Sequence, residues 1–434
     1  MKKINSLKIL KILFSIFATI SIFYFFEFYI ETSNVNGNFW CIQVSNDFNI
    51  GSYNISLPIH CDEGPYRLAS TSLEKFFSAE NPYQTRPLYV FLIFLLRQFV
   101  ETIFIFELSD YQNFRISSFL VQIIILGSIV YTFSYLMKLK FDNLKDYLLI
   151  ALVVAIPGIR WNLFFPSAGN LTLLFFLICL ALTAKKTSLL KNKNNVYIFF
   201  SFISLAHLSS IIYGLILELI DLLKTKKINF LKRLQNIFLL GLFPLVYRLL
   251  VYISDYEFYD WHTGVYSQFS WIMDELQTGN FFTFVTLNAH LKTYSEVTID
   301  YLGHFLLLII YFVILLAVVM IKKQKVPRKI KFAFFINTLI FLFWGLQGIY
   351  ESFRFTNYSI GYFLFISIFI LIIDSFKKNV YLIFSILFYF ASIGYLEPYN
   401  NQLDYPQLNL LTFFSILFFL VFSFQEIKLN YETN

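Results

Sequence analysis

The residues with the clearest capacity for chemistry lie in a polar stretch near the N-terminus. Asp62 and Glu63 stand side by side there, with Tyr66 and Arg67 following within one helical turn. A carboxylate beside a reacting hydroxyl group can remove its proton as a general base. Adjacent loop residues usually point apart, so these two carboxylates do not form the facing pair of a glycoside hydrolase. The alternative interpretation is a solvated acidic turn with no chemical role.

The arginines form a second set of candidates. The topology derived below assigns seven of the nine to the outer side of a membrane or its edge: Arg67, Arg86, Arg97, Arg115, Arg160, Arg248 and Arg354. A guanidinium group presents a planar fork that matches phosphate oxygens. Seven of them beside the carboxylates Asp62, Glu63 and Glu351 favour an outward-facing site for a phosphorylated lipid. The alternative is that they pair with outer-loop carboxylates or hold helices at the lipid headgroups.

Composition indicates an integral membrane protein. The chain has 434 residues, of which 58% are hydrophobic and 14% charged, whereas about 25% charged residues is usual for soluble proteins. The net charge of +7 does not indicate nucleic-acid binding. Its lysines lie in short clusters between apolar runs, as expected of cytoplasmic loops. Three cysteines without metal-binding spacing exclude a zinc ribbon.

Apolar runs near the length of a membrane span predict an all-α polytopic protein. About twelve transmembrane helices are expected, together with a juxtamembrane helix over 87–107 in the first outer loop. The predicted spans are 12–30, 115–138, 146–159, 169–184, 195–207, 208–223, 236–254, 304–321, 332–350, 358–375, 379–396 and 408–424. The first is interpreted as an uncleaved anchor, because no small-residue cleavage site follows it.

Lysine and arginine clusters set the predicted orientation. The N-terminal lysines and the clusters near 138–145, 185–193, 224–233, 322–331 and 377–378 all fall inside when both termini are cytoplasmic. If 87–107 crossed the membrane instead, the 138–145 cluster would lie outside. The segment 195–223 holds two short helices if the chain turns near Ala206-His207; a single tilted helix would reverse the later topology.

Two regions are expected. Residues 1–225 form an N-terminal transmembrane module with a first outer loop at 31–114, and residues 226–434 form a C-terminal transmembrane region with an outer loop at 255–303. Cys41 and Cys61 share the first loop, where an oxidising compartment would permit a disulfide bridge. The tyrosines and tryptophans of 255–303 either bind acceptor sugar or lie at the membrane interface.

The first outer loop resembles a known family. It contains Cys61-Asp62-Glu63-Gly64-Pro65-Tyr66-Arg67, followed by Arg86-Pro87-Leu88-Tyr89 at the start of an apolar stretch. An acidic pair, a tyrosine three residues later and a basic-Pro-Leu-Tyr element resemble the C-type membrane glycosyltransferases, in the branch of protein O-mannosyltransferases and lipid A aminoarabinose transferases. The resemblance extends over about residues 1–225. Many relatives carry an acidic residue where this chain has Asn170.

The resemblance implies an inverting transfer of a sugar from a polyprenyl-phosphate lipid to an acceptor glycan, lipid or protein on the outer face. Asp62 would be the general base, and Arg86, Arg160 and Arg354 would stabilise the leaving phosphate. Glu63 would hold a divalent metal ion or orient Arg67. The remaining expected substrate-binding residues are Tyr66, Tyr89, His207 and Glu351. His207 has a second interpretation, as a hydrogen-bonded structural residue.

The predicted location is the inner (plasma) membrane of a cell envelope, with no nucleic-acid partner. A divalent metal is the one cofactor considered. Two alternative functions remain: an O-antigen or capsule polysaccharide polymerase, and a lipid or polysaccharide transporter. The polymerase would need a large late outer loop, for which 255–303 is the candidate. Against the transporter, matching halves with Gly/Pro-broken spans are not evident.

Cysteine-accessibility labelling tests the predicted topology. Single cysteines near Lys140, Lys186 and Lys325 should react only after the membrane is permeabilised. Those near Asn54, Asn280 and Asn400 should react from outside. Reaction of the Lys140 region from outside would show that 87–107 crosses the membrane.

Overall fold

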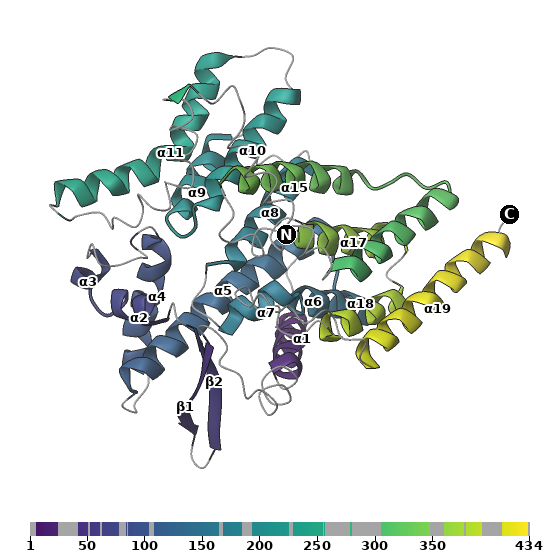
Figure 1. Cartoon of the computed structure of the whole chain (residues 1–434), viewed down its shortest axis with the longest axis horizontal. Helices are drawn as coiled ribbons and strands as arrows, with labels where there is room; N and C mark the ends of the chain where they lie inside the picture. Colours follow the sequence, from purple (N-terminus) through teal and green to yellow (C-terminus); the bar gives the residue numbers. More distant parts are fainter. Residues whose placement is uncertain are drawn as a thin grey trace.

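The protein is a body of packed helices with one projecting hairpin of strands (Figure 1). The structure is a computed structural model. It describes residues 6–24, 42–50, 53–60, 63–77, 84, 86–103, 108–164, 168–184, 193–224, 229–254, 256, 278–279, 305–347, 360–376, 379–392 and 410–432. Within these residues, the predicted helical class is confirmed for the packed body.

The helices of the N-terminal half are α1 (Ser6–Tyr24), α2 (Glu63–Ala69), α3 (Leu73–Phe77), α4 (Pro87–Ile103), α5 (Asp110–Met137), α6 (Leu144–Val154), α7 (Pro157–Phe164), α8 (Asn170–Ala184), α9 (Lys193–Ser204) and α10 (Ser209–Lys224). Those that follow are α11 (Phe230–Ile253), a helix over Phe305–Ile321, α15 (Arg328–Gln347), α17 (Tyr362–Asp374), α18 (Val380–Ser392) and α19 (Leu410–Glu432). Most coincide with a predicted apolar run.

The hairpin in the first outer loop was not predicted. Strands β1 (Ile42–Ile50) and β2 (Tyr53–His60) pair antiparallel, with Ile42 opposite His60 and an irregularity between Ser45 and Phe48. Strands of eight and nine residues in a polar loop cannot be recognised from apolar runs of membrane length.

The predicted span over 146–159 is not one continuous helix. Helix α6 ends at Val154, and α7 starts at Pro157. Proline disfavours helical conformation in the residue before it and is accommodated at the first helical position, where no N–H is required. Ile156 therefore lies between two short helices. At 11 residues and 1.5 Å per residue, α6 is too short to cross a bilayer alone.

The turn near Ala206-His207 is confirmed. Helices α9 and α10 are separate and pack against each other. The Leu205 carbonyl oxygen at this turn accepts a hydrogen bond from the Leu88 amide at 2.9 Å. Because Pro87 opens α4, Leu88 is among the first residues of that helix and has no intrahelical acceptor. The turn thus fastens the start of α4.

Helix α8 lies at the centre of the body and contacts α5, α10 and α15. Its side chains are buried along nearly its full length, as are those of α17. A helix that is apolar on all sides is buried either in a protein core or in a membrane, and α8 is covered by other helices. The N-terminal residue of α8, Asn170, is therefore held in a fully enclosed position.

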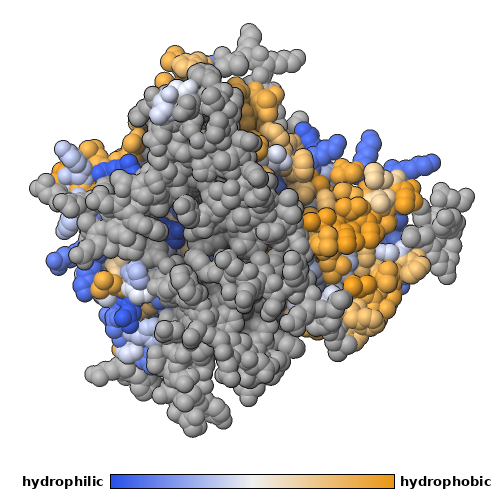
Figure 2. Space-filling model, viewed as in Figure 1, coloured by the Kyte–Doolittle hydropathy of each residue, from blue (hydrophilic) through white to orange (hydrophobic). Residues whose placement is uncertain are grey.

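Two of the described helices, α5 and α11, are long and apolar enough to cross a membrane. The outward face of α11 exposes large apolar side chains, among them Leu234, Phe238, Leu245 and Leu249. Figure 2 shows a further gathering of hydrophobic side chains on the side where α19 lies. These features agree with membrane association. The count of about twelve spans and the division near residue 225 stay predictions.

A buried ionic network holds α9, α10 and α11 together. Glu218 of α10 accepts hydrogen bonds from Arg233 at 2.6 Å, from Asn236 at 2.9 Å and from the hydroxyl of Tyr197. Arg233 also donates to Asp221 at 2.7 Å. Helices α10 and α11 come close together at Gly214, where a Cβ atom would lie 2.3 Å from Leu240 Cδ2.

Removal of Arg233 should destabilise the protein strongly. Arg233→Ala leaves the Glu218 carboxylate buried without its cation, which typically costs about 3–5 kcal/mol. Lys232→Ala, at the exposed neighbouring position, should change the unfolding free energy by about 0.5 kcal/mol or less. SDS-induced unfolding in mixed micelles measures both. Equal midpoints for the two variants would contradict this network as a stabilising element.

Candidate functional site

Glu63, the second carboxylate of the Asp62-Glu63 pair, is packed into the helical body. Asp62 lies outside the described residues, and α2 begins directly after it at Glu63. Glu63 is 2% exposed and forms an ion pair with Arg115 of α5, which is 5% exposed. The interpretation of a solvated turn is therefore wrong for Glu63. The expected orientation of Arg67 by Glu63 is also wrong, because Arg115 is the partner.

Tyr111 contacts both residues of this pair. Its hydroxyl donates to Glu63 Oε2 at 3.4 Å, and its ring lies below the guanidinium groups of Arg67 and Arg115, at 5.9 and 6.0 Å from the ring centroid. The carboxylate of Glu63 is thus neutralised by a cation and bonded to a hydroxyl. Such a carboxylate is poorly suited to bind a metal ion.

Metal binding finds no support in the described residues, where no cluster of three or more His, Cys, Asp or Glu could hold an ion. Asp62 is not among those residues. The divalent ion stays a prediction, and no step of the mechanism below depends on it.

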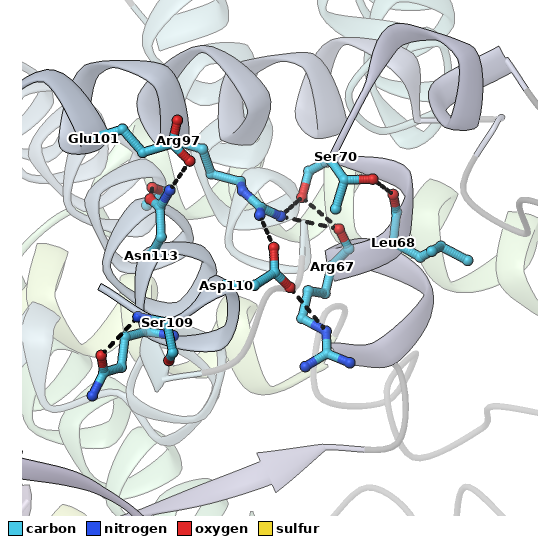
Figure 3. Close-up of polar contacts among 11 residues, drawn as sticks. Arg67, Leu68, Ser70, Arg97, Glu101, Ser109, Asp110 and Asn113 are labelled. Carbon is cyan, nitrogen blue, oxygen red and sulfur yellow. Dashed lines mark hydrogen bonds and ion pairs between the residues drawn. The ribbon is translucent and has the colours of Figure 1, made fainter. Parts of the chain in front are cut away.

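A second ionic cluster joins α2 and α4 to the start of α5 (Figure 3). Arg97 is buried and pairs with Asp110, which also lies 3.7 Å from Arg67 Nε. Arg97 Nη1 donates to the Arg67 carbonyl oxygen and to Ser70 Oγ, both at 3.1 Å, so it covers the C-terminal end of α2.

Glu101 lies one helical turn beyond Arg97 and accepts from Asn113 Nδ2 at 2.5 Å. Both side chains point from α4 toward α5 in Figure 3. Their spacing of four residues places them on one helix face. That signal was available in the sequence, but it did not identify Asp110 or Asn113 as the partners.

The alternative interpretation of the outer arginines is confirmed for three of them, since Arg67, Arg97 and Arg115 pair with carboxylates of the same region. They serve to hold α2, α4 and α5 together. Four of the seven arginines remain candidates for phosphate binding: Arg86, Arg160, Arg248 and Arg354.

Arg86, Tyr66 and Tyr89 are brought together. Arg86 Nη1 donates to the Tyr66 hydroxyl at 2.7 Å, and the rings of Tyr66 and Tyr89 meet edge to face with centroids 5.5 Å apart. Burial keeps the pKa of the Tyr89 hydroxyl well above its ordinary value, so this group retains its proton. Arg86 and the Tyr66 hydroxyl form a donor set suited to an anionic oxygen, and the Tyr89 ring packs beside them.

A line of buried amides continues from Tyr89 into the body. Gln122 of α5 donates to the Tyr89 hydroxyl at 2.7 Å, and Asn170 of α8 donates to Gln122 Oε1 at 3.3 Å. Asn170 also donates to the Ile159 carbonyl oxygen at 3.4 Å. The sequence analysis did not identify Gln122, because a lone glutamine in an apolar run gives no indication of its partner.

Arg160 and His207 hold structural contacts. Arg160 of α7 is buried, and its Nη2 donates to the Phe390 carbonyl oxygen of α18 at 3.0 Å. His207 Nδ1 accepts from the amide of Ser209 at 3.3 Å and lies 2.7 Å from Ser209 Oγ, so it caps the start of α10.

Other predicted residues fall outside the described part of the chain. These are Glu351, Arg354 and the two cysteines, Cys41 and Cys61, considered for a bridge. Their roles and the bridge stay predictions.

Comparisons of this chain with models of protein families, with characterised proteins and with solved structures gave no match. The functional argument therefore depends on the residues of this chain themselves.

A double-mutant cycle tests the Glu63–Arg115 pair. Glu63→Gln and Arg115→Met each leave one buried charge uncompensated and should each cost about 3 kcal/mol of unfolding free energy. The double variant should cost less than the sum by about 1–3 kcal/mol, because it removes both charges.

Arg67→Met provides the matched control within α2. Its side chain is 44% exposed, so its pairing with Asp110 should contribute about 1 kcal/mol or less. Additive costs in the cycle, to within about 0.5 kcal/mol, would mean that the two charges do not interact in the folded protein.

Proposed function

We propose that this protein is a membrane glycosyltransferase that moves a sugar from a polyprenyl-phosphate donor to an acceptor on the outer face of the membrane, with inversion. The acceptor is a glycan, a lipid or a protein. The enzyme lies in the inner (plasma) membrane as a multi-pass protein with both termini in the cytoplasm. The resemblance of the first outer loop to the C-type glycosyltransferases and the burial of that loop's acidic element support the proposal.

The burial of Glu63 carries the argument. A polar loop between apolar segments normally exposes its carboxylates, yet Glu63 is enclosed and paired with Arg115. Three residues further along α2, Tyr66 is enclosed as well and accepts from Arg86. Ordering charged groups in this way costs free energy that a mere connecting loop would not require. Asp62 directly precedes this helix in the sequence.

The proposed chemistry uses Asp62 as general base. The acceptor hydroxyl oxygen attacks the anomeric carbon from the side opposite the phosphate, and its proton passes to Asp62. The bond between the anomeric carbon and the phosphate oxygen breaks, and the phosphate leaves with the electron pair. Configuration at the anomeric carbon is inverted. Because the donor is already activated, the reaction needs no nucleotide.

The leaving phosphate gains negative charge as this bond breaks, and fixed donors aimed at it lower the barrier. Arg86 is the leading candidate, since the Tyr66 hydroxyl lies beside it and, as the acceptor in their hydrogen bond, can donate its own proton. Arg354 remains a second candidate. Arg160 is weaker, because its Nη2 is engaged by the Phe390 carbonyl oxygen.

Asp62→Asn tests the proposal. The amide keeps the size of the carboxylate but cannot accept the proton, so sugar transfer should fall by about 10²–10⁴-fold. The donors to assay are undecaprenyl phosphates carrying glucose, galactose or mannose, with total membrane lipids and envelope glycans as acceptors. Binding of undecaprenyl phosphate should remain near that of the unaltered protein.

Two controls sharpen this test. Glu74→Gln changes an exposed carboxylate of α3 in the same loop and should leave transfer intact. Arg86→Ala should weaken binding of undecaprenyl phosphate by about 10–100-fold, as expected for one lost charge-assisted contact. Unaltered transfer in Asp62→Asn would end the assignment of the base. Absence of undecaprenyl-phosphate binding by the unaltered protein would end the assignment of the function.

A further inference from the structure

The buried amides beyond Tyr89 form a hydrogen-bonded line across three helices. It runs from Tyr89 of α4 through Gln122 of α5 to Asn170 of α8, with bonds of 2.7 and 3.3 Å. All three side chains are enclosed, and each is uncharged at neutral pH. Neutral polar residues in the interior of an apolar helical body join helices or serve a ligand.

The line has a fixed direction. Asn170 Nδ2 lies against two oxygens, Gln122 Oε1 and the Ile159 carbonyl, and the carbonyl can only accept. The amide group of Asn170 must therefore face them with its nitrogen. Gln122 then presents its oxygen to Asn170 and its nitrogen to Tyr89. Since the Tyr89 hydroxyl accepts in this line, its own proton can be donated elsewhere.

The far end of the line is an acceptor without a donor. Asn170 Oδ1 is buried and makes no hydrogen bond within the described part of the chain, in a residue that is 0% exposed. Buried acceptors are rarely left in this state. The group that satisfies Asn170 must bring an O–H or N–H. A neutral amide compensates a full charge poorly in such surroundings, which favours a hydroxyl group over an ammonium group.

The opposite end adjoins the proposed phosphate site. Tyr89 contacts Tyr66 edge to face, and Tyr66 accepts from Arg86. A ligand with an anionic group at Arg86 would meet a hydroxyl donor at Tyr89, and an acceptor at Asn170 beyond it. Polyprenyl-phosphate sugars have this order of groups, with the phosphate attached to a ring that carries several hydroxyls.

We propose that Tyr89, Gln122 and Asn170 form the subsite for the sugar ring of the donor, and that it selects uncharged, hydroxyl-bearing sugars over cationic amino sugars. Asn170 Oδ1 accepts a hydroxyl proton of the ring, and the Tyr89 hydroxyl donates to a ring oxygen. This inference rests on the proposed function, which supplies the donor lipid. It adds the class of sugar and assigns roles to Gln122 and Asn170.

The experiment compares lipid binding with and without the sugar. The probes are undecaprenyl phosphate, its glucose, galactose and mannose esters, and its 4-amino-4-deoxyarabinose ester, each in detergent micelles. The unaltered protein should bind at least one hexose form about 3- to 10-fold more tightly than undecaprenyl phosphate, and the amino-sugar form no more tightly than undecaprenyl phosphate. Asn170→Leu should abolish the hexose advantage and leave binding of undecaprenyl phosphate unchanged.

Further variants separate a binding role from a structural one. Tyr89→Phe keeps the ring contact with Tyr66 and should reduce the same advantage, which provides the test if Asn170→Leu does not fold. Asn170→Asp should shift preference toward the amino-sugar form. Asn236→Leu is the matched control and should retain the hexose advantage. Asn236 Oδ1 is likewise buried and has no hydrogen bond to any residue that the structure describes, but Asn236 belongs to the Glu218 network.

The outcomes distinguish this inference from the function on which it rests. If the unaltered protein binds undecaprenyl phosphate but no hexose form more tightly, the subsite is overturned and the function stands. The same holds if Asn170→Leu and Tyr89→Phe keep the hexose advantage, as they would if a water molecule or helix packing alone explained the line. If none of the undecaprenyl lipids binds, the proposed function fails first.

Discussion

Glu63 and Arg115 face each other in a region from which solvent is excluded, and this pair fixes the first outer loop to the helical body. Two charges withdrawn from water are costly unless each compensates the other and finds further hydrogen bonds. Tyr111 provides one such bond to Glu63. Helix α2 can therefore occupy only the orientation that keeps Glu63 against α5. Tyr66, in the same helix, is held in place by the same pair.

The cost of burying a charge also explains how α4 is oriented. Although α4 is largely apolar, its Arg97 and Glu101 side chains point toward α5. Arg97 forms an ion pair with Asp110, and Glu101 accepts a hydrogen bond from Asn113. Arg97 additionally covers the C-terminal carbonyl groups of α2. The opening of α4 is held by the Leu205 carbonyl oxygen of the α9–α10 turn. Arg86 and Tyr89, which flank that opening, are thus positioned by contacts from two separate parts of the chain.

These contacts create two chemically different environments in the proposed enzyme, one around Arg86 and one around Asn170. Around Arg86 the donors are cationic or phenolic and suit a phosphate group. Around Asn170 the groups are neutral amides in an apolar environment, where a hydroxyl can be bound at little electrostatic cost. An enzyme that handles a lipid-linked sugar must hold an anion and a neutral ring next to each other. The arrangement of α2, α4, α5 and α8 meets this requirement with residues from four helices.

The sequence by itself determined the helical class, the positions of most helices and the turn at Ala206-His207, because apolar runs and breaks are local properties of the chain. It also singled out Glu63, Tyr66, Arg86 and Tyr89. The sequence did not show which residues pair. Glu63 pairs with Arg115 and not with Arg67, and Gln122 joins Tyr89 to Asn170. These partners lie 33 to 52 positions apart in the chain. Only the packing of helices brings such residues together. Tertiary structure also buried Arg97, whose charge Asp110 compensates, while Glu101 stays exposed and accepts a hydrogen bond from Asn113.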